Sequence, residues 1–164
     1  MKGVKMLNIQ KEQQYSKIVE KYSDMIFRIA YQYLFNNYDA EDIVQEVFVK
    51  LLTKKVIFKD EEHVKSWLIR VTINHCLDYK KTLAKRSVVP IENMEIPFEQ
   101  KEEGILEELQ LLKEDERNIL YLYYYEGYKI KEIAKILKQK QNTINSKLTR
   151  ARKKLKEIME VKNE

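Results

Sequence analysis

Side chains capable of acid–base, nucleophilic or metal chemistry are few in this chain. His63, His75 and Cys76 are its only histidines and cysteine, and their spacing does not repeat as the spacing of metal ligands does. His75 and Cys76 are adjacent, so on a helix they point in different directions. The chain has no glycine-rich phosphate loop. We therefore expect a protein that is not an enzyme and that uses no metal, no cofactor and no small-molecule substrate.

Hydrogen-bonding residues gather instead in KQNTINSKLTRARKKL, residues 140–155. Ile144, Leu148 and Ala151 recur there at the spacing of one helical face. Short polar residues and cations occupy other positions of the same helix: Asn142, Thr143, Asn145, Ser146, Lys147, Thr149 and Arg150. Such side chains can read base edges in the major groove of DNA, where arginine pairs with guanine. The alternative is a basic helix that is merely solvated.

The preceding segment, YKIKEIAKILKQKQ at residues 128–141, predicts a second amphipathic helix. We expect Ile133 and Ala134 to pack against Ile144 and Leu148 across a turn at residues 138–141. Two helices of unequal length around a short turn form the helix-turn-helix pattern. This pattern favours DNA binding over the solvated helix, although the turn lacks the glycine often found there.

Another candidate is the helix predicted at residues 38–52, YDAEDIVQEVFVKLL. Acids fill its first half and lysines close it, an order that complements the helix dipole. Gln45 and the acids also lie beside Val44 and Phe48, which we expect to be exposed. An exposed face of acidic and apolar residues often marks a protein partner. The residues alone leave these two interpretations equal.

Residues 63–81, HVKSWLIRVTINHCLDYKK, mix aromatic residues with cations. A lone tryptophan at helical spacing, such as Trp67, is most often a core residue. Aromatic rings interleaved with Arg70, Lys80 and Lys81 also suit single-stranded or distorted DNA, whose exposed bases stack on such rings.

Composition limits the fold that holds these residues. The chain has 164 residues, 44% of them hydrophobic, with 3 glycines and 2 prolines, which predicts an all-α protein. One cysteine fits a reducing cytoplasm, and no apolar run reaches the roughly 18–20 residues of a membrane span. Lys and Arg outnumber Asp and Glu by 16 to 11 in residues 1–86 and by 12 to 4 in residues 127–164. Two basic ends favour nucleic acid as a partner.

Both prolines fall in SVVPIENMEIPFEQKEEG, residues 87–104, which has no helical period. We predict a flexible linker there between two small helical domains. Helices are predicted before it at about residues 10–35, 38–52 and 60–86, with Asp39 capping the second. Helices are predicted after it at about residues 103–111, 114–126, 128–141 and 140–158, with Gly127 as a left-handed cap. The domains expected are residues 1–86 and 104–164, and the acidic linker is residues 87–103.

Three segments, taken in order, resemble the bacterial RNA polymerase sigma factors of the extracytoplasmic-function (ECF) group. YDAEDIVQEVFVKLL resembles the family's conserved region 2 helix, and SWLIRVTINHCLDYKK resembles the helix that follows it. DERNILYLYYYEGYKIKEIAKIL together with NTINSKLTRARKKL resembles region 4. The resemblance covers most of the chain and implies a region 2 helix bundle followed by a region 4 helix-turn-helix.

The resemblance also implies roles for individual residues. The residues implied to dock on the clamp helices of the largest subunit of RNA polymerase core are Asp42, Gln45, Glu46 and Phe48. The residues implied to read and hold the melted −10 element of promoter DNA are Phe58, Lys59, Asp60, His63, Trp67, Arg70, Asn74, Lys80 and Lys81. The seven polar residues at 142–150 named above are implied to read the −35 element.

The expected function is that of a sigma factor, which binds core polymerase, recognises both promoter elements and directs the initiation of transcription. The family further implies a cytoplasmic protein that is monomeric when free. Its expected inhibitor is an anti-sigma factor, often membrane-bound, in a 1:1 complex. One alternative is a stand-alone helix-turn-helix regulator, which would normally dimerise; another is an all-helical adaptor. Charge reversal on the face at Asp42 distinguishes the sigma factor from the regulator.

Overall fold

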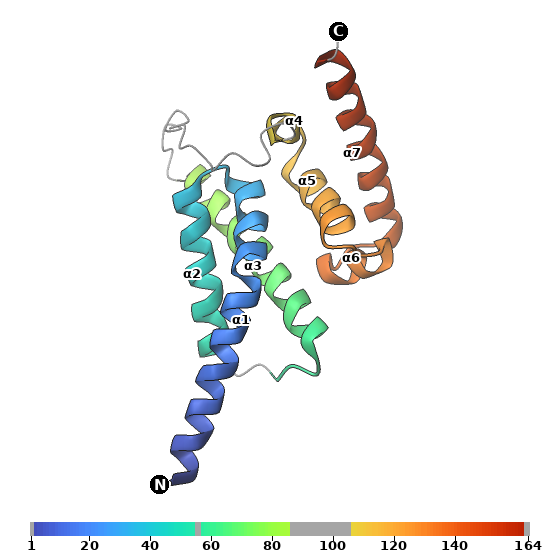
Figure 1. Ribbon diagram of the computed structural model, residues 1–164. Helices are drawn as coiled ribbons and strands as arrows, with labels where there is room; N and C mark the ends of the chain where they lie inside the picture. Colours follow the sequence, from blue (N-terminus) through green and yellow to red (C-terminus); the bar gives the residue numbers. More distant parts are fainter. Residues whose placement is uncertain (1, 55–56, 86–105, 163–164) are drawn as a thin grey trace. The chain divides into compact units, whose positions relative to one another are not determined.

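The computed structural model describes residues 2–54, 57–85 and 106–162, with side chains for residues 12–54, 57–85 and 108–161. The predicted linker at residues 87–103 lies outside the described residues. Within the described ranges every regular element is a helix, which confirms the all-α expectation. The chain divides into two compact units, one in residues 1–85 and one in residues 86–164. Figure 1 labels the helices of each unit.

The first unit is a bundle of three helices. They are α1 (Lys2–Leu34), α2 (Asn37–Thr53) and α3 (Glu61–Lys85), and each packs against the other two. Each helix contributes a buried apolar stripe to the shared core, and its main members are Tyr22, Ile26, Ile29, Tyr33, Ile43, Val47, Val64, Leu68 and Val71. Because these residues recur every three or four positions, one face of each helix is buried and the opposite face stays free for contacts.

The start of α2 differs from the sequence prediction. Asn36, not Asp39, is the N-cap: its backbone is extended, and its side-chain oxygen accepts a hydrogen bond of 3.0 Å from the Asp39 N–H. The prediction of Asp39 was wrong because Asp39 already lies in the first helical turn, where its charge favours the helix dipole. The predicted start of the next helix is confirmed. Asp60 precedes α3, and its carboxylate accepts a 2.7 Å hydrogen bond from the His63 N–H.

The second unit is built around one long helix. Its elements are α4 (Leu106–Gln110), α5 (Glu114–Leu120), the π-helical turn η1 (Tyr121–Tyr125), α6 (Ile130–Leu137) and α7 (Gln141–Lys162). Helices α4, α5 and α6 all contact α7. Ile133, Ala134, Ile144 and Leu148 are buried, as predicted for a helix-turn-helix. Long α7 therefore buries one face in the unit and exposes the rest.

Two turns shape the helix-turn-helix. The prediction of one α-helix over residues 114–126 was wrong, because the backbone widens at η1, where the Glu126 N–H reaches back five residues to the Tyr121 carbonyl at 3.1 Å. Gly127 then takes the predicted left-handed conformation, with φ 72°. Helix α6 ends at Lys138, which is also left-handed, with φ 52°. A lysine thus occupies the turn position where glycine is more common.

Candidate functional site

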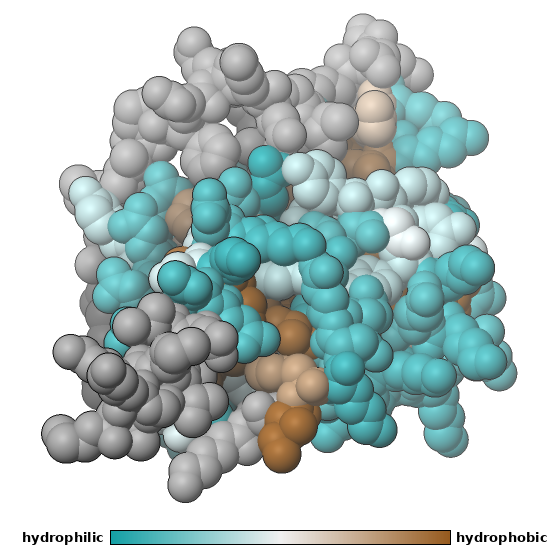
Figure 2. Space-filling view, turned by 60° about the horizontal axis from the view of Figure 1, so that its bottom comes forward, coloured by the Kyte–Doolittle hydropathy of each residue, from teal (hydrophilic) through white to brown (hydrophobic). Residues whose placement is uncertain are grey.

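The free face of α2 carries a regular stripe of exposed residues. Tyr38, Asp42, Gln45, Val49 and Leu52 follow one another at steps of 4, 3, 4 and 3 positions. A mean step of about 3.5 residues is the repeat of a coiled-coil seam. The surface seen in Figure 2 is mostly hydrophilic, yet here a tyrosine, a valine and a leucine are 67%, 57% and 61% exposed. This face of α2 has the form of a seam for a helix of another molecule.

Phe48 lies on the opposite face. It is only 6% exposed, and its ring meets that of Tyr15 edge-on at a centroid distance of 6.3 Å. The expectation that Phe48 is exposed was wrong, because the helical turn carries it towards α1, and Val44 is half-buried. Sequence reasoning missed Val49 and Leu52, although their spacing from the acids already indicated this face.

Glu46 is exposed but not free. Its carboxylate lies 2.8 Å from Nδ1 of His75 on α3, and Nε2 of the same ring lies 3.3 Å from the ammonium of Lys50. An ammonium group can only donate, so Nε2 must accept and Nδ1 must carry the proton given to Glu46. The imidazole therefore holds two residues one turn apart on α2. No local sequence pattern indicated this role for His75.

Aromatic rings meet where the loop before α3 joins that helix. The Phe58 ring lies edge-on to His63 at 5.4 Å and to Trp67 at 5.6 Å. The Lys59 N–H donates to Nδ1 of His63 at 3.3 Å, which leaves the ring's own proton on Nε2. All three rings are half-buried, whereas Lys59 and Asp60 are exposed. The loop thus presents a small aromatic surface with a cation beside it, rather than a closed core.

The remaining residues predicted to bind the −10 element follow along α3. Arg70 is half-buried, and its buried Nε has no hydrogen-bond partner among the described residues. Asn74 and Lys81 are exposed, and Lys80 is half-buried. Trp67 and Lys81 are 14 positions apart, which is about 21 Å along a helix axis. These residues therefore form an extended row and not one pocket, an arrangement that suits a strand lying along the helix.

Helix α7 exposes its polar residues on the side away from the core. The residues in question are Asn142, Thr143, Asn145, Ser146, Thr149 and Arg150, all exposed. At 100° per residue they fall within an arc of about 160° centred opposite the buried stripe. The Thr149 hydroxyl donates to the Asn145 carbonyl at 2.9 Å, so it is left as an acceptor. Six of the seven residues predicted for the −35 element thus share one open face.

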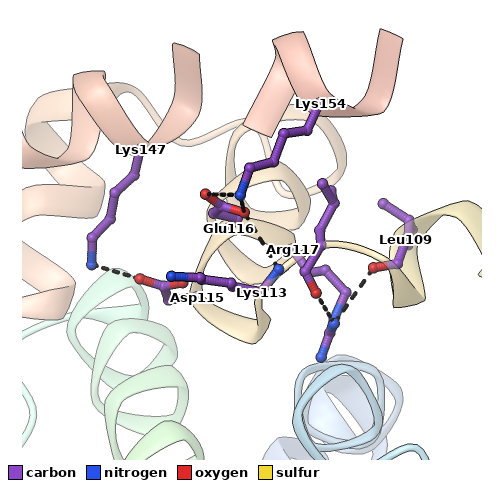
Figure 3. A network of polar contacts seen from close by, with 8 residues as sticks. Leu109, Lys113, Asp115, Glu116, Arg117, Lys147 and Lys154 are labelled. Atoms are coloured by element: carbon purple, nitrogen blue, oxygen red, sulfur yellow. Dashed lines mark hydrogen bonds and ion pairs between the residues drawn. The ribbon is translucent and has the colours of Figure 1, made fainter. Parts of the chain in front are cut away.

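Lys147, the seventh, is placed differently. Its ammonium lies 2.7 Å from the Asp115 carboxylate and 3.2 Å from Oε1 of Gln139. Beside it Lys154 binds both oxygens of Glu116, at 3.0 and 2.9 Å. Figure 3 shows these contacts joining α5 to α7. The sequence could not reveal them, because the pairs are 32 and 38 positions apart.

The Asp115 carboxyl illustrates the electrostatics of this network. Partial burial raises its pKa, but the hydrogen bond and charge of Lys147, together with backbone N–H groups, outweigh that effect and hold the pKa below its usual value. The opposite case is Cys76 in the first unit, where burial raises the pKa of the thiol to about 12. The cysteine is therefore a packing residue and not a nucleophile.

Aromatic and cationic side chains also meet on the far side of α7. The Arg152 guanidinium lies 5.0 Å from the ring centroid of Tyr123 and 5.3 Å from that of Tyr124. These rings belong to the π-helical turn. Cation–π contact therefore fixes η1 against α7.

The remaining expectations concern metal ions and membranes. The described residues contain no group of three or more His, Cys, Asp or Glu side chains arranged to hold a metal ion. None of the described helices is both long and apolar enough to cross a membrane.

Comparison with known proteins identifies both units. Residues 18–86 match the family model for Sigma-70 region 2, and residues 102–155 match the model for Sigma-70, region 4. The chain is 31% identical over 132 residues to the RNA polymerase sigma factor SigV of Bacillus subtilis, an alignment that covers 77% of this chain and 80% of SigV. It is 25% identical to the ECF RNA polymerase sigma factor SigW of the same organism, with 94% of each chain covered.

A solved structure has the same fold. The sigma factor RpoE of Bartonella quintana, in a complex with the anti-sigma factor NepR, superposes with a TM-score of 0.77 at 22% identity, covering 91% of this chain and 98% of that one. Region 2 coincides with the helix bundle that carries the α2 seam, and region 4 coincides with the helix-turn-helix. The chain therefore belongs to the sigma-70 family of RNA polymerase sigma factors, in its extracytoplasmic-function group.

Proposed function

We propose that this sigma factor docks on RNA polymerase core through the exposed seam of α2. The partner surface is the clamp helices of the largest subunit. Asp42, Gln45 and Glu46 supply charge and hydrogen bonds, and Val49 and Leu52 supply the apolar contact. Phe48 supports the seam from inside the bundle. The single observation that carries this proposal is the exposed stripe with a coiled-coil step, because such a seam is complementary to another helix.

The two DNA-facing surfaces follow from the same family role. The aromatic rings at Phe58, His63 and Trp67 would receive an unstacked base of the −10 element, since flipped bases are held by stacking and edge contacts. Along α3, Arg70, Asn74, Lys80 and Lys81 would hold the rest of the melted strand. Lys59 and Asp60 flank the aromatic surface at the loop. The open face of α7, with Asn145 and Arg150, would read the −35 element in the major groove.

We assign the chain accordingly. Residues 1–86 are the region 2 domain for polymerase and −10 DNA, residues 87–103 are a linker, and residues 104–164 are the region 4 domain for −35 DNA. The protein performs no covalent chemistry and selects promoters for polymerase. It acts in the cytoplasm as a monomer when free, or as a 1:1 complex with an anti-sigma factor. The complex of the related RpoE with NepR supports the last point.

The experiment is co-elution of the purified protein with bacterial RNA polymerase core, comparing wild type with the double variant Asp42→Arg/Gln45→Ala. Wild type is expected to bind stoichiometrically and the variant to lose binding. A matched control is Asp24→Arg, a charge reversal at an exposed residue of α1. No binding by a folded wild type would contradict the proposal and favour the stand-alone regulator. Loss in the control as well would indicate a general charge effect.

The stand-alone regulator and the adaptor are less well supported. Membership of the family accounts for both units, whereas a regulator has no use for a polymerase seam on α2. An adaptor has no use for the open polar face of α7. Removing Arg150 would leave an adaptor's activity intact but should weaken promoter binding by a sigma factor.

A further inference from the structure

Lys147 lies on the recognition helix, yet its ammonium is held inside the second unit. It contacts Asp115 on α5 at 2.7 Å and donates to Gln139 in the turn before α7 at 3.2 Å. Its side chain is 20% exposed, compared with 79% for Lys153 on the same helix. Lys147 therefore joins three parts of the unit, namely α5, the turn and α7.

A second ion pair repeats this contact two helical turns further along α7. Glu116, the residue after Asp115, binds Lys154 with both carboxylate oxygens, and its side chain is only 4% exposed. Lys147 and Lys154 are seven positions apart and so lie on the same side of α7. Figure 3 shows both pairs reaching from the first turn of α5. Two consecutive acids thus hold two points of α7 and oppose rotation of the helix about its axis.

Rotation matters because the residues proposed to read DNA are arranged around that axis. A shift by one position turns a helix by about 100°, which would carry Asn145 and Arg150 out of the open face. The same contacts leave Lys147 poorly suited to bind phosphate. Asp115 neutralises its charge, and two of its three N–H groups are already directed at protein oxygens.

We propose that Lys147 is a positioning residue, which through Asp115 and Gln139 fixes the rotation and register of α7 and does not itself contact promoter DNA. This inference rests on the proposed −35 function and changes one of its members. The cations of the DNA-facing surface are then Arg150 and its exposed neighbours, and the acidic first turn of α5 is part of the recognition apparatus.

The opposite model makes a contrary prediction for Asp115. If Lys147 binds a phosphate, Asp115 competes with DNA for it. Asp115→Asn would then strengthen DNA binding and steepen its salt dependence. If Lys147 is a positioning residue, Asp115→Asn weakens binding by releasing α7, and the salt dependence is unchanged. The two models differ in the sign of one measured effect.

The test uses full-length protein assembled with bacterial RNA polymerase core, and a duplex selected from a random-sequence pool by the wild-type holoenzyme. Affinity is measured against salt concentration for Lys147→Met, Asp115→Asn, their double variant and Arg150→Met. Lys156→Met removes one exposed cation from the far end of α7 as a matched control. Removal of one phosphate contact should lower the log–log salt slope by about 0.9. The Arg150 variant is expected to show this decrease.

Both single variants at the ion pair are expected to bind several-fold more weakly with an unchanged slope, and the double variant no more weakly than either. A slope lowered by Lys147→Met, or stronger binding by Asp115→Asn, would overturn the proposal. The free proteins give an independent readout. Unfolding equilibrium constants of the same three variants should be non-additive by at least about twofold; additive values would also overturn it. If the pair is coupled but no duplex is selected, the −35 function fails while the structural role of Lys147 stands.

Discussion

The His75 imidazole on α3 bridges Glu46 and, on its other nitrogen, Lys50 of α2, with the carboxylate 2.8 Å from Nδ1. The ring therefore links the helix proposed to meet polymerase with the helix proposed to hold DNA. Both partners on α2 are long, flexible side chains, and each loses rotational freedom when it binds the ring. The contact presets the direction in which Glu46 leaves the α2 seam.

His75→Leu should remove both contacts and lower the free energy of unfolding of the first unit by about 1 kcal/mol, a typical net value for hydrogen bonds. His75→Gln can still donate to Glu46 and accept from Lys50, so it should retain most of this stability. Urea unfolding, followed by the fluorescence of Trp67, the single tryptophan, measures the difference. Equal stability of the two variants would mean that the bridge contributes nothing.

The apolar part of the α2 seam can be tested separately from its charges. Leu52 is 61% exposed, so Leu52→Ala should leave folding intact. If it contacts the polymerase clamp helices, the variant should bind core about tenfold more weakly, which corresponds to about 1.4 kcal/mol. Leu111→Ala is the matched control, because Leu111 is 70% exposed in the second unit. Unchanged affinity for the Leu52 variant in a titration with core would exclude this residue from the interface.

Lys138 offers a test of the helix-turn-helix backbone. Its φ of 52° is left-handed, a conformation that costs a non-glycine residue about 1–2 kcal/mol. Since the side chain is exposed, Lys138→Gly should raise the stability of the second unit by about 1 kcal/mol, measured as a shift in the urea midpoint of α7 amide signals. Lys140→Gly, at an ordinary φ, should give no gain. Equal effects of the two changes would mean that strain at Lys138 is not released.

Cys76 should be unreactive in the folded protein. With a thiol pKa of about 12, only about one thiol in 10⁴ is ionised at pH 8, and the thiolate is the reactive form. Iodoacetamide should therefore label the native protein far more slowly than the urea-unfolded protein, as followed by mass spectrometry. Rapid native labelling would reveal that α3 separates readily from the rest of the bundle.

The second unit should lose stability in acid partly through Asp115. The pKa of this carboxyl is lowered in the folded protein, so its contribution is present above the ordinary aspartate range and is lost as pH falls through the folded value. Thermal unfolding between about pH 5 and pH 2 should therefore depend on pH less steeply in Asp115→Asn than in wild type. Parallel profiles would show that the contact with Lys147 is not maintained in solution.

The helices themselves could be predicted from sequence because apolar residues at three- and four-residue steps determine which face is buried. The errors arose where spacing does not decide. Phe48 and Val49 are neighbours, and only the angle at which α2 meets α1 determines that the first is buried and the second exposed. Asn36 and Asp39 are both good N-caps, and the choice depends on where the backbone leaves the extended conformation.

The candidate site shows the same division. The open face of α7 followed from the periodicity of Ile144 and Leu148, and it survives in the structure with six of its seven residues exposed. The place of Lys147 did not follow, because its partner Asp115 lies on another helix. No local pattern marks an ion pair between distant segments. Side chains that serve the site by holding other side chains are therefore the ones that sequence reasoning omits.

The π-helical turn at Tyr121–Tyr125 contains one more residue than an α-helical turn would need to form each hydrogen bond. This extra residue acts as a shim between α5 and the helix-turn-helix that follows. Loss of a single tyrosine from the run would let the turn close to the ordinary helical pitch, and every element after it would rotate by about 100° relative to α5. The geometry of promoter recognition is in this sense adjustable by the length of one turn, without any change in the residues that face DNA.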